Sequence, residues 1–193
     1  MSHEGTKGTK ASALEAGLVV HTLSGWQQST LIVLRTVIGW HFLYEGYVKL
    51  LGPVWTRAGV PLQPFSSAGY LRNATGPLAD VFHAMAASPW IGTLDLVVAW
   101  TLFAAGLFLL LGLFTQLGCV LAAGLLAMFY VSAIPLSGVA EPRAEGSYLI
   151  VNKNLIELAA VATLFAFRTG RIAGLDRLWI ARRMLARQNE AAA

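Results

Sequence analysis

The sequence predicts an all-α integral membrane protein built as a bundle of four membrane-spanning helices. Hydrophobic residues make up 56% of its 193 residues and charged residues only 12%, whereas soluble domains carry about 25% charged residues. The mean hydropathy is +0.61. The stretch from Leu96 to Ala140 contains no charged residue, and its 45 residues are about twice the number that a helix needs to cross a bilayer.

That uncharged stretch divides into two spans. The turn-forming segment Gly112–Gln116 separates a span over about 94–113 from one over about 115–134, which Pro135 ends. Two more apolar stretches, about 30–51 and 148–167, are long enough to cross a membrane but contain charged residues. A charge at bilayer depth costs about 2.5 kcal/mol or more, so we expect those side chains to snorkel, to pair or to face a cavity.

The distribution of Lys and Arg predicts that both chain termini are cytoplasmic. Cytoplasmic flanks of membrane helices are enriched in these residues. Eight lie before the first span or after the fourth: Lys7, Lys10, Arg168, Arg171, Arg177, Arg182, Arg183 and Arg187. Only three lie in the loops on the other side: Arg57, Arg72 and Arg143.

The segments outside the spans differ in composition. Residues 1–29 contain no convincing signal peptide, because their apolar part is short and interrupted by Glu15, and we expect a cytoplasmic or interfacial segment. The outer loop, 52–93, is expected to cover the mouth of the bundle and to hold a helix over Pro77–Ala87. The basic cytoplasmic tail, 168–193, is typical of a surface helix, or of a flank that only snorkels.

Polar side chains of three spans are expected to meet near the outer end of the bundle. The first span runs outward, while the second and fourth run inward, so the polar residues of all three fall at a similar depth. Arg35 lies nearer the cytoplasmic side. The candidate ligand-binding residues are Arg35, Glu45, Lys49, Asp95, Asn152, Lys153, Asn154 and Glu157.

Helical periodicity refines this picture. At about 100° per residue, one stripe of the first span contains Arg35, Gly39, Phe42, Gly46 and Lys49. Lys153 and Glu157 are four residues apart and can form a pair. The polar residues are compatible with two interpretations: they form a pocket for a small molecule or a quinone head group, or they only hold the helices together.

Other kinds of site find little support in the sequence. The single cysteine, Cys119, excludes an internal disulfide and a metal site with several cysteines, and CxxC, HExxH, P-loop and GxGxxG motifs are absent. His41 is the only histidine well inside a span and is typical of a core or interface histidine. We therefore expect no metal site and no redox cofactor bound by this chain alone. Nucleic-acid binding is not expected, because the basic residues cluster at the chain ends.

Four segments resemble the DoxX/DoxD family. Arg35–Leu50 contains an Arg, a Gly, Phe-Leu, a second Gly and Lys-Leu in the order of the family's first-helix signature. Asp95 and the Gly-Leu-rich run Gly106–Gln116 resemble the second signature, although Gln116 stands where the family usually has Arg, which argues against a cationic loop there. Glu145–Leu158 and Thr169–Leu178 resemble the fourth-helix and tail signatures.

This resemblance implies a multi-pass protein of the bacterial inner membrane. DoxD is the membrane subunit of a thiosulfate:quinone oxidoreductase, so the resemblance implies a quinone-interacting oxidoreductase subunit with a partner membrane or periplasmic protein. The alternative is a non-catalytic accessory subunit of a larger electron-transport or photosynthetic complex. Both remain open at the level of sequence, as does the question of whether the chain is an enzyme, and no catalytic residue is assigned.

Overall fold

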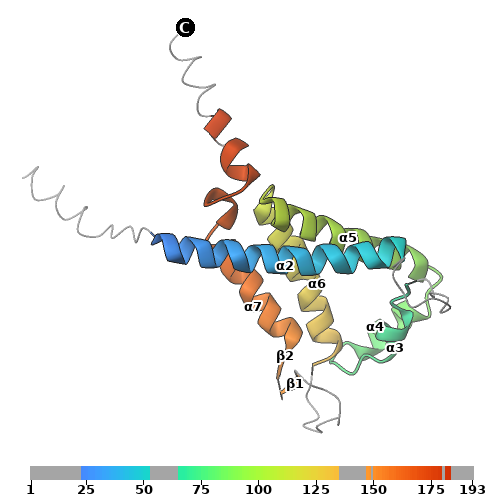
Figure 1. The fold of residues 1–193 in the computed structure, drawn as a ribbon. Helices are drawn as coiled ribbons and strands as arrows, with labels where there is room; N and C mark the ends of the chain where they lie inside the picture. The colour runs from blue at the N-terminus through green and yellow to red at the C-terminus, as the bar shows by residue number, and fades with distance from the viewer. Residues whose placement is uncertain (1–22, 53–64, 135–146, 149, 180, 184–193) are drawn as a thin grey trace, which may run out of the picture. The chain divides into compact units, whose positions relative to one another are not determined.

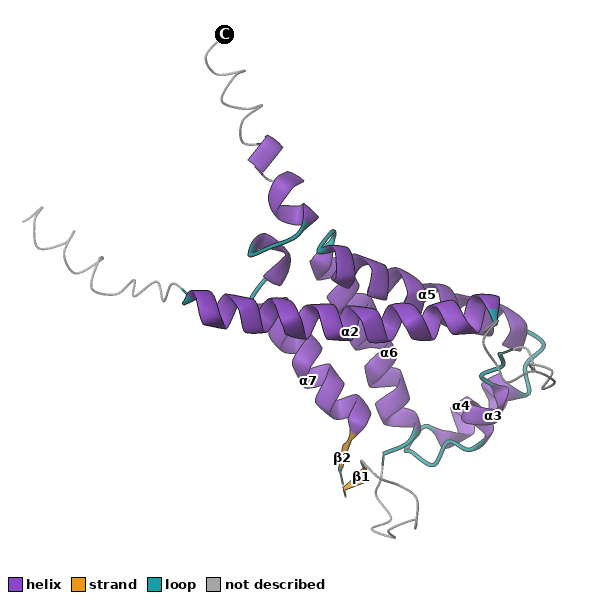
Figure 2. Cartoon of the chain, in the orientation of Figure 1, coloured by secondary structure: helices purple, strands orange, loops and turns teal. Residues whose placement is uncertain are grey.

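The computed structural model describes residues 23–52, 65–134, 147–148, 150–179 and 181–183. Most of the expected N-terminal segment, parts of the two outer loops and the end of the basic tail lie outside the described residues. The chain divides into two compact units, Met1–Thr30 and Leu31–Ala193. The described part is mostly helical, as the predicted all-α class requires (Figure 2).

Among the described residues, four helices are long and three are short. Figure 1 labels the long helices along the chain. The long helices are α2 (Gly25–Leu51), α5 (Ile91–Leu111), α6 (Thr115–Ser132) and α7 (Lys153–Ala166). The short ones are α3 (Ala68–Arg72), α4 (Ala79–Ala86) and the 3-10 turn η1 (Thr169–Arg171). Further helical turns occupy 175–179 and 181–183 in the tail.

Two helices of the described chain, α5 and α6, are long and apolar enough to cross a membrane. Their most apolar windows have mean hydropathies of 2.2 and 1.6. Helices of this kind favour an association with a membrane. The helix α2 carries three charged side chains, Arg35, Glu45 and Lys49, and α7 is shorter than the other long helices.

The predicted helical span over 148–167 is wrong at its start. Ser147–Tyr148 (β1) and Val151–Asn152 (β2) form a short antiparallel pair instead, and the helix begins at Lys153. Asn152 has an extended backbone, and its side chain accepts a hydrogen bond of 3.1 Å from the backbone N–H of Leu155. This cap leaves a helix of 14 residues, about 21 Å long, against a hydrocarbon core of about 30 Å.

The predicted stripe of α2 is the face that packs in the core. Arg35, Gly39, Phe42 and Gly46 are all buried. A Cβ atom added at Gly39 would lie 2.7 Å from the backbone nitrogen of Leu110, and one at Gly46 would lie 2.6 Å from the Cα of Phe103. The α2 and α5 backbones therefore approach as closely as helices do where small residues line a membrane interface.

The helices α5, α6 and α7 complete one apolar core. The helix α6 packs against both α5 and α7. The buried residues of this core include Leu102, Ala105 and Leu109 of α5, Ala122 of α6 and Leu164 of α7. The bundle of four long helices has two ends, which we name the cavity end and the tail end. The cavity end holds the end of α2, the starts of α5 and α7, and the end of α6; the tail end holds the α5–α6 turn and η1.

The loop between α2 and α5 packs at the cavity end. Its helix α4 confirms the predicted helix over Pro77–Ala87. Buried Phe82 and Ala86 pack with Leu71 and Ala74, next to Val131 near the end of α6. The Tyr70 hydroxyl donates to the carbonyl oxygen of Phe129 at 3.0 Å, and the Thr75 N–H donates to that of Ser132 at 3.0 Å. These bonds tie the loop to the end of α6.

Candidate functional site

Two cavities adjoin at the cavity end of the bundle. The larger, which we call the main cavity, has a volume of about 270 Å³ and is lined by Lys49, Phe65, Ser67, Tyr70, Leu71, Leu94, Val98, Met128, Phe129, Lys153 and Asn154. The smaller, the side cavity, has about 130 Å³ and is lined by His41, Phe42, Glu45, Lys49, Leu102, Leu126, Phe129, Lys153, Asn154 and Glu157. Because four of these residues line both cavities, the two hollows lie side by side.

Most of the predicted polar cluster surrounds these cavities. Glu45 and Lys49 come from the last turns of α2, while Lys153, Asn154 and Glu157 come from the first turns of α7. Two helices that are distant in sequence thus bring five of the eight candidate residues together. The four formal charges among them, two carboxylates and two ammonium groups, cancel, which fits a partly buried site.

Lys49 is held at the wall that both cavities share. Its ammonium group donates a hydrogen bond to Glu45, one helical turn earlier in α2. It also lies 4.9 Å from the centroid of the Phe65 ring, within the range of a cation–π interaction. The Lys49 side chain is 20% exposed, compared with 44% for Glu45. The carboxylate and the ring therefore fix a positive charge beside the main cavity.

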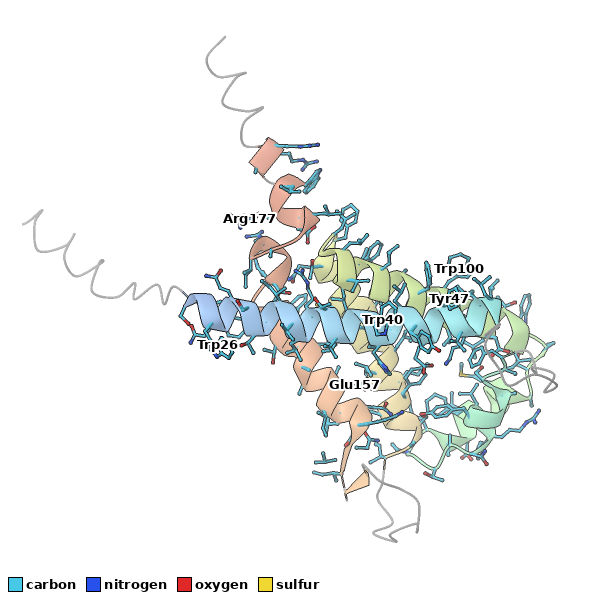
Figure 3. The ribbon with its side chains drawn as sticks, viewed as in Figure 1. Trp26, Trp40, Tyr47, Trp100, Glu157 and Arg177 are labelled. Atoms are coloured by element: carbon cyan, nitrogen blue, oxygen red, sulfur yellow. The ribbon has the colours of Figure 1, made fainter. Side chains whose placement is uncertain are left out.

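The amino terminus of α7 supplies the other polar wall. The Asn152 cap starts the helix so that Lys153 and Asn154 line both cavities. Lys153 and Glu157, whose spacing would allow them to pair, form no ion pair with each other in the structure. Glu157 faces α2 instead: its Oε1 atom lies 3.7 Å from Nε2 of His41. Figure 3 labels Glu157 on α7.

His41 is the site residue that sequence reasoning missed. It was assigned to a core or interface position, but its side chain is 49% exposed and lines the side cavity opposite Glu157. A signal existed in the spacing, since His41, Glu45 and Lys49 follow one another at four-residue intervals and so share a face of α2. Four-residue spacing alone also fits ordinary packing, so it did not single out His41.

Three predicted site residues do not line either cavity. Asp95 accepts a hydrogen bond of 2.7 Å from the Ser67 N–H and another from the Ser67 hydroxyl. Asn152 caps α7 and also donates to the Ala133 carbonyl at 3.3 Å. Arg35 lies at the tail end. Asp95 and Asn152 therefore position backbone near the cavities and line neither of them.

Arg35 binds two backbone carbonyl groups after α7. Its Nη1 atom donates to the carbonyl oxygens of Thr169, at 3.0 Å, and Ala173, at 2.5 Å. Only 4% of Arg35 is exposed. The charged side chain thus joins α2 to the segment that follows α7.

The main cavity combines a largely apolar lining with hydrogen-bond donors from two helices, α2 and α7. Leucine, valine, methionine and phenylalanine side chains form most of its lining, and Lys49, Lys153 and Asn154 supply the donors. Such a site suits a small, largely apolar ligand that carries carbonyl or anionic oxygen atoms. Within the described ranges, no group of three or more His, Cys, Asp or Glu side chains could hold a metal ion.

Comparison of the chain with models of known protein families, with curated proteins and with solved structures found no match.

Proposed function

We propose that the chain is a DoxX/DoxD-like subunit of a membrane oxidoreductase, with four membrane helices and both termini in the bacterial cytoplasm. The apolar helices α5 and α6 support the membrane location. The close packing of α2 on α5, and of α7 on α6, supports a single bundle of four. The excess of Lys and Arg in the terminal flanks supports the orientation, which directs the cavity end toward the periplasm.

The function that the geometry supports best is binding of a quinone head group in the main cavity. The observation that carries this proposal is the placement of Lys49, Lys153 and Asn154 in the lining of a largely apolar cavity of about 270 Å³. This volume is near the lower limit for small-molecule sites, about 300 Å³, and so suits a single substituted ring. A quinone ring has apolar faces and carbonyl oxygens that accept hydrogen bonds.

Each polar residue would have a distinct role. The Lys49 and Lys153 ammonium groups and the Asn154 amide would donate hydrogen bonds to the ring oxygens. Glu157 and His41 lie 3.7 Å apart beside the shared wall, where they could hold and transfer protons. A bound quinone would supply a two-electron, two-proton redox couple. Its electrons would come from a partner subunit or from a sulfur compound that the partner oxidises.

The experiment is a binding titration with a short-tailed quinone analogue. The full chain, purified in detergent, is titrated and followed by tryptophan fluorescence or calorimetry. We expect Lys153→Met to weaken binding about tenfold or more, because a charge-assisted hydrogen bond contributes about 1.5–3 kcal/mol. The matched control is Arg182→Met, which removes one positive charge from an exposed residue outside both cavities. Equal affinities for the wild type and Lys153→Met would contradict the proposal.

The second candidate function is that of an accessory subunit in a larger membrane complex. Trp40, near the middle of α2, is 59% exposed, and Trp100, near the middle of α5, is 54% exposed (Figure 3). Tryptophan in membrane proteins concentrates at the lipid–water interfaces, so exposed mid-helix tryptophans favour contact with a partner helix. Trp40→Leu and Trp100→Leu should then release the chain from its native complex and leave quinone binding unchanged.

A further inference from the structure

A third cavity lies at the tail end of the bundle, distant in the fold from the main cavity. Its volume is about 310 Å³. The start of α6 contributes Thr115 and Gln116, and the segment after α7 contributes Arg168 and Arg171. Trp179 of the tail also lines it. None of these residues takes part in the proposed quinone site.

The polar lining of this cavity suits an anion. Arg168 and Arg171 carry the positive charges, and Asp176 is the one acidic residue of the lining. The two Asp176 oxygens accept hydrogen bonds from the backbone N–H groups of Phe114, at 2.7 Å, and Thr115, at 2.9 Å. The carboxylate is thus bound to the start of α6, and the lining retains a net charge of +1 from two arginines and one aspartate. Guanidinium groups match the geometry of phosphate oxygens.

The rim of the cavity is apolar and exposed. Phe114 is 51% exposed, Leu117 49% and Trp179 46%. These apolar side chains would gain nothing from contact with a free phosphate ion, but they can pack against the glycerol and acyl portions of a phospholipid. Basic pockets between membrane helices on the cytoplasmic side bind anionic lipid head groups, and tryptophan is frequent at that depth.

We propose that this cavity binds the phosphate of an anionic phospholipid of the phosphatidylglycerol type. Arg168 and Arg171 bind the phosphate oxygens, and the acyl chains lie against Leu117 and Phe114. The inference rests on the proposed membrane location, because it needs the tail end to lie at the cytoplasmic surface of the bilayer.

The test is native mass spectrometry of the full chain in detergent micelles. Wild-type protein is mixed with phosphatidylglycerol or with phosphatidylcholine of the same acyl chains. We expect retained phosphatidylglycerol to exceed retained phosphatidylcholine, and we expect the double variant Arg168→Gln/Arg171→Gln to retain it about tenfold less. The matched control is Arg177→Gln/Arg182→Gln, which removes two tail charges outside the cavity lining and should change retention by less than about twofold.

Three outcomes would overturn the proposal. Equal phosphatidylglycerol retention by the wild type and both double variants, at unchanged thermal stability, would exclude these arginines. An equal loss of retained phosphatidylglycerol in both double variants would indicate that the lipid is attracted by the overall positive charge of the tail and not by this cavity. Displacement of the lipid by inorganic phosphate, together with binding of phosphate alone, would assign the cavity to the free anion. Quinone-analogue binding by the same variants is measured separately: its absence contradicts the proposed function and leaves the lipid result unaffected.

Discussion

The carboxylate of Asp176 accepts a hydrogen bond of 2.9 Å from the backbone N–H of Thr115, so a residue that follows the fourth long helix caps the start of α6. The Asp176 N–H donates to the carbonyl oxygen of Gly112 at 2.8 Å. Gly112 ends α5 with φ at 63°, a left-handed conformation that glycine adopts without steric cost. The tail thereby closes the α5–α6 turn on both sides.

Replacing Asp176 with Ala should lower the free energy of unfolding by about 1–2 kcal/mol, because an amino-terminal cap contributes about that much. The measurement is thermal unfolding in detergent. Asp80→Ala is the matched control, since Asp80 is exposed in the first turn of α4. Equal melting temperatures for Asp176→Ala and Asp80→Ala would show that the cap contributes nothing measurable.

Replacing Arg35 with Met should destabilise the bundle by about 2–3 kcal/mol. The change leaves the carbonyl oxygens of Thr169 and Ala173 without their charged donor. Two such bonds contribute about 3–6 kcal/mol together, and removal of the cost of burying the guanidinium group offsets part of that sum. Arg35→Lys should recover part of this loss, since an ammonium group can still donate. An unchanged melting temperature of Arg35→Met would contradict this prediction. It would mean that the free energy gained by removing a buried charge equals the free energy of the two lost hydrogen bonds.

The α2–α5 crossing offers a matched pair of glycine substitutions. Gly46→Ala should cost about 1–3 kcal/mol, because its new methyl group would overlap the backbone of Phe103. Gly124→Ala in α6 meets no atom within 4 Å and should be neutral or slightly stabilising, since Ala is the better helix former. Both are measured by unfolding in detergent, and similar melting temperatures would contradict the close crossing.

Periodicity and chain direction predicted the parts of the structure that follow from helix geometry. The stripe from Arg35 to Gly46 is buried because the spacing of 3.6 residues per turn sets one face of a helix. Glu45 and Lys153 meet at one end because successive long helices of the bundle run in opposite directions. These are general consequences of helix geometry and alternation, and they do not depend on which side chains surround each residue.

Hydrogen bonds to backbone groups explain what the sequence could not predict. Asp95 and Asn152 are predicted to face a ligand, but Asn152 caps the start of α7, as Asn commonly does, and Asp95 binds the backbone of Ser67, 28 residues away. The role of Asp176 depends on a partner, Thr115, 61 residues away in the chain. Lys49 lies beside Phe65 only because the loop after α2 returns to the cavity end, which composition does not reveal.

Replacing Asn152 with Ala tests a positioning role next to the cavity. The variant should lose about 1 kcal/mol of stability, as other cap removals do. It should also weaken binding of the quinone analogue, because the first turn of α7 carries Lys153 and Asn154. Asn152→Asp should restore part of both properties, since its carboxylate can accept the bond from the Leu155 N–H but cannot donate to the Ala133 carbonyl. If Asn152→Ala binds the quinone analogue as tightly as the wild type, the cap does not position the residues that bind the ligand.

Replacing Asp95 with Ala tests the opposite wall of the main cavity. Asp95 does not line this cavity, but it holds the N–H of Ser67, which does line it and is 8% exposed. Loss of the carboxylate leaves a buried donor unpaired, at a cost of about 1–3 kcal/mol. We therefore expect a lower melting temperature and weaker binding of the quinone analogue.

Asp95→Asn is the diagnostic partner of that substitution. Its amide oxygen can still accept the bond from the Ser67 N–H, so it should recover most of the lost stability and affinity although it lacks the negative charge. If Asp95→Asn instead binds the analogue as weakly as Asp95→Ala and still melts near the wild-type temperature, the ligand depends on the charge of Asp95 and not on its hydrogen bond to Ser67. That result would return Asp95 to the ligand-binding residues.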